Sequence, residues 1–366
     1  MRCLNLFLLM VAFLLFGCNE YAPESHLLYY KEENGLERPV KRPSQWKIKR
    51  QQILAGMELA MGKLPDMSNL PDFDMQISET VTGDRYTRIT INFKAAENER
   101  VTANLYIPLY TEPDVKLPAI LALHGTARDI GKLAIDREFS RPNREYASEL
   151  AERGYVVIAP DYPGMGELSG HDFDNDRYES GTMKAIFNHM RCVDLLQTMK
   201  EVDPERIGVI GHSLGGHNSM FVGVFDTRLK VIVSSCGWTL MDYYDKSITG
   251  IGNPRTLAPW AQDVYMPYIR DKYNLDPKKV PFDFDEVIAA LAPRAFFSNS
   301  PVGDTNFDVE GVKKGMEEVA EVYRFFKSEE NLQVRYPDAE HDFPEEVRFE
   351  AYEFIDKILK HSDTIK

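Results

Sequence analysis

Residues 206–216 constrain the fold of this chain more than any other segment, and they read Arg-Ile-Gly-Val-Ile-Gly-His-Ser-Leu-Gly-Gly. The β-branched run at 207–210 predicts a buried strand, and the residues after 216 are compatible with a helix. The G-x-S-x-G turn between them forces Ser213 into strained backbone geometry and exposes its hydroxyl at the top of a sheet. We therefore expect an α/β sheet with a nucleophilic serine at its edge. The alternative is a structural glycine turn that happens to contain a serine.

Short apolar segments alternate with helical segments along most of the chain, which is typical of a mostly parallel sheet of about eight strands with helices on both faces. Two strands, at 76–93 and 100–108, precede this alternation. The later strands are expected at 119–123, 155–160, 206–210, 230–235, 294–298 and 332–336, and the helices at 143–153, 183–201, 217–224, 309–327 and 345–360. Ligands bind such a sheet at the carboxyl ends of its strands.

Two regions depart from this alternation. Residues 238–284 are long, rich in tyrosine and proline, and lack a clear strand, so we expect an inserted cap over the active site. Residues 18–75 are polar and irregular at first and then show helical spacing at 44–61. We interpret them as a tether followed by a helical extension, with the α/β domain at 76–366.

The N-terminus resembles a bacterial lipoprotein signal. A positive charge precedes the apolar run at 4–16, which is shorter than the roughly 20 residues that span a membrane. The resemblance implies cleavage after residue 17, lipid on Cys18, and a protein exported to the bacterial envelope and anchored in its membrane. An ordinary secretory signal cut nearby is the alternative.

Charge and cysteine usage limit the possible partners. The formal net charge is −14 and no Lys/Arg-rich run stands out, which argues against nucleic acid because binding it requires phosphate neutralisation. Cys192 and Cys236 either form a disulfide or remain buried thiols. No C-x-x-C pair or His-rich tract predicts a metal, and no cofactor is expected. The sequence leaves the oligomeric state open.

A serine nucleophile needs a base and a third group that orients the base. Of the eight histidines, His341 has the most suitable position, because it follows the last predicted strand and precedes the last helix. The acid should lie on another loop after a strand. Asp304 follows the strand at 294–298 and is the first choice, and Asp308 on the same loop is the alternative.

The predicted oxyanion hole consists of two backbone N–H groups, those of Leu214 at the helix start and Thr126 after the strand at 119–123. Further expectations concern substrate binding. Arg177 and Tyr178 could reach a substrate carboxylate such as a uronate, and Trp238 could offer a stacking platform for a sugar ring. Trp238 and the other aromatic side chains of the cap could equally well pack within it.

Ser213, Asp304 and His341 occur in the order found in α/β-hydrolases, and the chain resembles that superfamily over about residues 76–366. Residues 161–166 resemble its glycine-bearing loop. Residues 284–294 resemble the entry to the acid-bearing strand in dienelactone hydrolase-like and acetyl xylan esterase-like members, although dienelactone hydrolases proper carry a cysteine nucleophile.

The resemblance implies a serine esterase that forms an acyl-enzyme. An exported esterase suggests acetyl, methyl or aromatic esters on polysaccharides or oligosaccharides as substrates. A serine peptidase of the oligopeptidase-like type is one alternative. A non-catalytic binding lipoprotein is the other.

Overall fold

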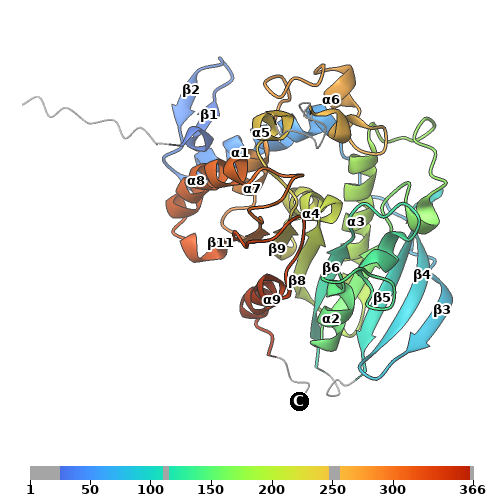
Figure 1. The fold of residues 1–366 in the computed structure, drawn as a ribbon. Coiled ribbons are helices and arrows are strands. Elements are labelled where there is room, and N and C mark those ends of the chain that lie inside the picture. The colour runs from blue at the N-terminus through green and yellow to red at the C-terminus, as the bar shows by residue number, and fades with distance from the viewer. Residues whose placement is uncertain (1–24, 110–114, 247–255, 363–366) are drawn as a thin grey trace, which may run out of the picture.

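The computed structural model describes residues 25–109, 115–246 and 256–362, and its centre is a nine-stranded sheet in the order β11-β10-β9-β8-β6-β7-β5-β4-β3 (Figure 1). Strands β6 to β11 pair in parallel, and β3, β4 and β5 form an antiparallel edge. The predicted α/β-hydrolase fold is confirmed. The strands are β3 (Gln76–Thr82), β4 (Tyr86–Ala96), β5 (Glu99–Pro108), β6 (Leu117–Leu123), β7 (Val156–Pro160), β8 (Val202–His212), β9 (Leu229–Ser235), β10 (Ala295–Asn299) and β11 (Leu332–Arg335).

The segment at 76–93, predicted as one strand, forms the two strands β3 and β4. The segment at 76–93 contains a tight turn, in which the Gly83 N–H donates to the Tyr86 carbonyl at 3.0 Å. Residues 83–85 read Gly-Asp-Arg, and this turn chemistry ends β3 and starts β4. The hairpin adds one strand to the expected eight.

Helices cover both faces of the sheet because alternate side chains of its buried strands point in opposite directions. Ile120 packs in a cluster with α2 (Tyr146–Glu152) and α9 (Glu345–Leu359). Leu121 packs in another with α3 (Gly181–Thr198), α4 (Leu214–Phe225) and α8 (Val309–Phe325). The carboxyl ends of the parallel strands therefore remain uncovered by these helices.

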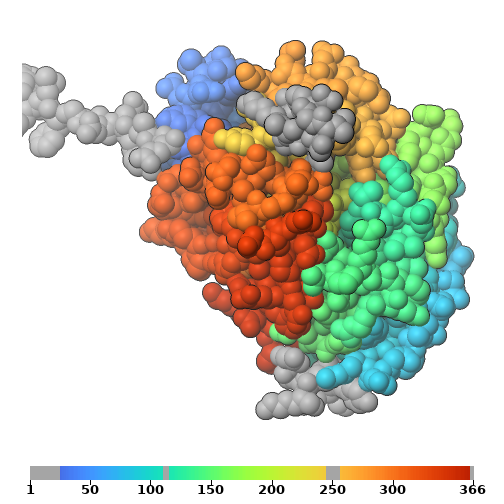
Figure 2. All heavy atoms as spheres, viewed as in Figure 1, coloured from blue at the N-terminus to red at the C-terminus, as the bar shows by residue number. Residues whose placement is uncertain are grey.

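The N-terminal segment packs on the body from residue 25 onward. It forms η1 (His26–Leu28), a small sheet of β1 (Tyr29–Lys31) and β2 (Glu37–Pro39), and helix α1 (Pro43–Met61). The polar composition predicted an irregular start, but Leu27, Leu28 and Val40 are fully buried in the main core. Figure 2 shows this blue segment against the red C-terminal part and the orange cap. The predicted signal peptide and Cys18 lie outside the described residues. Within the described ranges, no helix has both the length and the apolar character needed to cross a bilayer.

The predicted cap lies between β9 and β10, and residues 247–255 of it are outside the described part. It contains the short helices α5 (Met241–Lys246), η4 (Ala258–Ala261) and α6 (Tyr268–Asp271), and α7 (Phe284–Ala289) leads back to the sheet. Three other short turns of 3₁₀ helix are η2 (Gly131–Ile135), η3 (Gly166–Leu168) and η5 (Glu329–Asn331). Cys192 and Cys236 are both buried and free, so they do not form a disulfide in this structure.

Candidate active site

Ser213 stands at the junction of β8 and α4 in a strained conformation, with φ 57° and ψ −119°. Its N–H donates to the Ser235 carbonyl at 2.8 Å, which ties the turn to β9. A Cβ at Gly215 would lie 1.9 Å from the Leu123 carbonyl oxygen, and one at Gly211 would lie 2.2 Å from the Gly215 carbonyl oxygen. Only glycine fits at these two positions. The packing around the turn therefore holds the strained serine in place.

His341 and Asp304 form a close pair. The His341 Nδ1 atom lies 2.9 Å from Asp304 Oδ2 and 3.0 Å from Oδ1. The carboxylate is nearly inaccessible, and its Oδ1 also accepts the N–H groups of Asn306 and Phe307 at 2.8 and 3.2 Å. Asp308 instead accepts the Glu310 N–H at 2.8 Å and caps α8. The structure thus places Asp304, and not Asp308, beside His341.

The histidine loop is held by contacts that the sequence did not reveal. The Gly303 N–H donates to the Ala339 carbonyl at 3.0 Å, which joins the acid loop to the histidine loop. From the other side, Arg144 donates to the His341 carbonyl at 2.9 Å and to the Asp342 carboxylate at 2.5 Å. Arg144 is therefore a positioning residue that fixes the backbone on which His341 stands.

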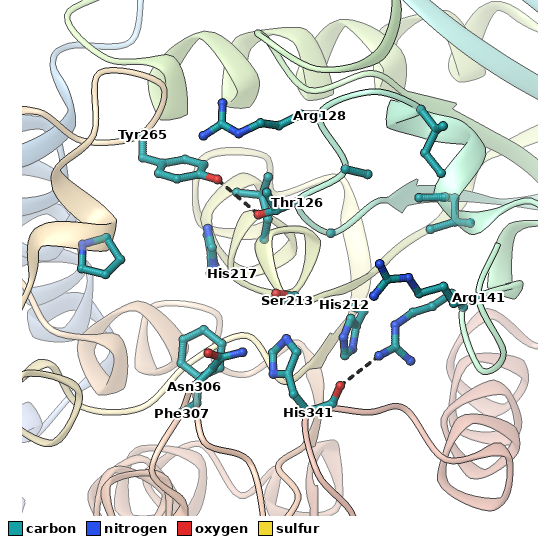
Figure 3. A pocket seen from close by; sticks show the side chains of 18 of the residues that line it. Thr126, Arg128, Arg141, His212, Ser213, His217, Tyr265, Asn306, Phe307 and His341 are labelled. Carbon is teal, nitrogen blue, oxygen red and sulfur yellow. Dashed lines mark hydrogen bonds between the residues drawn. The ribbon is translucent and has the colours of Figure 1, made fainter. Parts of the chain in front are cut away.

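Ser213, His341, Leu214 and Thr126 all line one pocket of about 850 Å³, shown in Figure 3 with the His341 ring directed toward Ser213. Leu214 is the first residue of α4, so its N–H has no intrahelical acceptor. A Cβ at Gly125 would lie only 3.5 Å from that of Ser213, which shows how closely the loop after β6 approaches the serine. Both predicted oxyanion donors are thus on segments next to the nucleophile.

The other histidines near the pocket are neutral. Burial, together with the nearby Arg144 and His341, lowers the pKa of His212 well below its usual value, and burial lowers that of His217 to about 3. His212 Nδ1 lies 2.9 Å from the Ser235 hydroxyl. His124 contacts the Gly125 carbonyl and accepts the N–H of Tyr162 at 3.0 Å, so it braces the loop after β6.

One side-chain group in the described part of the chain has metal-ligand spacing. Ligand atoms of His212, Cys236 and His341 lie within 4.8 Å of one another. Burial raises the pKa of the Cys236 thiol well above its usual value, and the nearby Asp304 carboxylate raises it further. The thiol is therefore protonated at neutral pH and donates to the Asp342 carbonyl at 3.1 Å. These contacts make the group part of the support for His341.

Arg177, Tyr178 and Trp238 do not occupy the positions expected for substrate binding. Arg177 forms an ion pair with Glu99, and the buried Tyr178 donates to the same carboxylate at 2.9 Å. Trp238 is buried and donates from its indole nitrogen to Ser298 at 3.0 Å. None of the three lines the pocket. Their polar groups are satisfied within the fold, which explains why they do not reach the site.

The comparisons with known proteins agree with this architecture. Residues 61–249, just over half of the chain, match the family described as acetyl xylan esterase (AXE1). The chain belongs to the acetyl xylan esterase family. Residues 173–326 also match the family described as glucuronyl esterase, fungi. Membership shows that the protein is a carboxylic ester hydrolase, which favours an enzyme over a non-catalytic binding lipoprotein.

Individual relatives extend over most of the chain. YtaP of Bacillus subtilis (strain 168) is 25% identical over 308 residues, 82% of this chain and 96% of that protein. Carbohydrate esterase MZ0003, from an unknown prokaryotic organism, is 25% identical over 332 residues, 78% of this chain and 75% of that protein. A solved glucuronoyl esterase from Solibacter usitatus has a TM-score of 0.68 and 18% identity, covering 93% of this chain and 98% of that one. The family and its relatives support carbohydrate ester hydrolysis.

Proposed function

We propose that Ser213, His341 and Asp304 hydrolyse carbohydrate esters through an acyl-enzyme. Ser213 attacks the ester carbonyl while His341 accepts the hydroxyl proton, and the Leu214 and Thr126 N–H groups stabilise the oxyanion. His341 then protonates the leaving oxygen. In the second half, His341 activates a water molecule that attacks the acyl-enzyme, and Ser213 leaves with the proton from His341. Asp304 keeps the imidazole oriented and stabilises its positive charge in both halves.

The observation that carries this proposal is the His341–Asp304 pair beside a strained serine. The two distances of 2.9 and 3.0 Å fix the imidazole so that Nδ1 faces the carboxylate. Its other nitrogen, Nε2, is then the one available to Ser213 in the pocket. A serine at φ 57° is maintained against its backbone strain, which is common at functional sites.

The substrates that we propose are acetyl, methyl or aromatic esters on polysaccharides or oligosaccharides. The pocket is large enough for more than one sugar ring, and its cap side carries Tyr244, Trp260 and Tyr265. Flat aromatic side chains of this kind can pack against the apolar face of a sugar. The relatives that match most of the chain or its fold include a carbohydrate esterase and a glucuronoyl esterase.

Hydrolysis of p-nitrophenyl acetate by the purified protein tests the proposal. The Ser213→Ala variant should lose activity by at least about 1,000-fold. Ser219→Ala is a matched control on the same helix, since the Ser219 hydroxyl donates to the Gly215 carbonyl at 2.8 Å and should not affect turnover. Retained activity in Ser213→Ala would exclude this serine as the nucleophile. Faster turnover of peptide nitroanilides than of any ester would favour a serine peptidase instead.

We further propose that the protein is exported and anchored to the bacterial envelope by lipid on Cys18. The apolar run at 4–16, which Gly17 and Cys18 follow, supports this location. An envelope esterase would meet polysaccharides outside the cytoplasm. Cys18→Ser should abolish lipid labelling and move the protein from the membrane fraction to the aqueous fraction. Unchanged membrane partitioning of that variant would refute the anchor.

A further inference from the structure

The ionisable residues of the pocket differ in sign from the protein as a whole. The chain carries a formal charge of −14. Arg128, Arg141 and Arg144 nevertheless line the pocket, and Asp129 is the one carboxylate among its described lining residues. All four come from the segment between β6 and α2, so one stretch of chain supplies a positively charged wall. A cleft with this charge attracts anions to an otherwise acidic protein.

Two of the three arginines have guanidinium groups that no carboxylate neutralises in the part of the chain that the structure describes. Arg144 is already paired with Asp342, as described above. Arg128 is exposed and has a side-chain contact with the amide oxygen of Gln262 at 3.4 Å. Arg141 is also exposed, and within the described ranges neither it nor Arg128 forms an ion pair with an acidic side chain. These two groups are therefore available to an anionic ligand.

The positions of the two arginines relative to the nucleophile suggest what that ligand is. Figure 3 shows Arg128 above Ser213, beside Tyr265 of the cap, and Arg141 to the right of Ser213, near His212. Both arginines thus border the space around Ser213, from two different directions. A saccharide whose ester is at Ser213 would therefore have two guanidinium groups near its neighbouring sugar residues, with an aromatic ring of the cap beside Arg128.

We propose that Arg128 and Arg141 bind the carboxylates of uronic acid residues next to the attacked ester. This inference rests on the proposed function and narrows its substrate to a uronate-containing saccharide. A guanidinium presents paired N–H donors that match a carboxylate bidentately, whereas a neutral sugar offers no such partner. The role that the sequence suggested for Arg177, the recognition of a substrate carboxylate, thus passes to two arginines that the structure places in the pocket.

Direct binding tests the proposal without depending on catalysis. We would titrate trigalacturonate and xylotriose into the Ser213→Ala protein at low salt by calorimetry. Comparison of trigalacturonate with a glucuronate-substituted xylotriose would show which uronic acid is preferred. Tighter binding of either acidic sugar than of xylotriose supports the carboxylate site. Each of Arg128→Gln and Arg141→Gln should weaken binding of the preferred acidic sugar by about five-fold, as expected for partly exposed charge pairs. The double variant should bind it no better than xylotriose.

The matched control is Arg85→Gln in the turn between β3 and β4, an exposed arginine that does not line the pocket. It removes the same charge and should leave the affinity unchanged. Equal affinity for acidic and neutral sugars, or an unchanged affinity in the double variant, would overturn the proposal. If the wild type cleaves p-nitrophenyl acetate in a Ser213-dependent way but shows equal affinities, then only this inference fails. If the acidic sugar binds tightly but no ester is cleaved, then only the proposed function fails.

Discussion

Replacing Asp304 by asparagine should nearly abolish activity while preserving the shape of the site. Asp304 Oδ1 accepts two backbone N–H groups, from Asn306 and Phe307, at 2.8 and 3.2 Å. An asparagine would keep its carbonyl oxygen at that position, so its NH₂ group would replace Oδ2, which lies 2.9 Å from His341 Nδ1. A donor at this position requires Nδ1 to act as an acceptor. The ring proton would then move to Nε2, where it blocks proton transfer from Ser213.

The wrong tautomer costs about 10,000-fold in kcat in a serine–histidine–aspartate site, or about 5.4 kcal/mol of transition-state stabilisation. The assay is kcat for p-nitrophenyl acetate, with Asp308→Asn as the matched control. Because asparagine is also a good N-cap, that control should keep both its activity and its stability. A kcat for Asp304→Asn within ten-fold of the wild type would show that Asp304 does not set the tautomer of His341. A loss confined to Asp308→Asn would show that the acid was assigned to the wrong carboxylate.

Three further predictions follow from the fold. Gly215→Ala should cost about 3 kcal/mol of unfolding free energy in a urea titration, because the new Cβ would lie 1.9 Å from a β6 carbonyl oxygen. Gly170→Ala has no atom within 4 Å of the new Cβ and should be neutral, and equal stability of the two variants would contradict this account. Burial raises the pKa of Asp283 from 3.8 to about 7, so the folded protein holds a proton that the unfolded chain releases. Asp283 should therefore lower stability by up to roughly 4 kcal/mol as pH rises from about 4 to 7, and Asp283→Asn should remove this contribution; an identical pH profile of stability in wild type and variant would refute the assignment. Tyr265→Phe removes a contact of 3.2 Å with the Thr126 hydroxyl, and should lower kcat by a few-fold if the cap steadies the oxyanion loop. An unchanged kcat would show that the cap does not steady this loop.

Much of the site follows from local sequence signals. The glycine spacing around Ser213 predicts the turn because only glycine fits the backbone contacts there. The positions of Asp304 and His341 follow from the topology, since loops after parallel strands meet at one sheet edge. Local turn chemistry also explains why the single strand predicted at 76–93 was wrong. The Gly-Asp-Arg turn that separates β3 from β4 was present in the sequence but was hidden within a longer segment rich in β-branched residues.

Other features depend on contacts between distant segments, which a single sequence does not show. Leu27 and Leu28 lie in a polar stretch, yet they are buried because the main core offers them a surface. Arg177 was expected to reach substrate, but Glu99, 78 residues away in the chain, binds its guanidinium. One sequence signal could have identified Arg128 and Arg141. They are arginines that cluster after the strand at 119–123, in an otherwise acidic chain. That neither forms an ion pair with any described acidic residue is visible only in the folded protein.

Covalent trapping with an active-site reagent is the most direct test of Ser213 as the nucleophile. A fluorophosphonate reacts with an activated serine, and trypsin would release Ser213 within the peptide of residues 207–228, after Arg206 and up to Arg228. We expect one equivalent of label per chain, located on Ser213 by fragmentation mass spectrometry and absent from both Ser213→Ala and acid-denatured protein. Label on another residue of the active protein, or complete inactivation without modification of Ser213, would contradict this assignment.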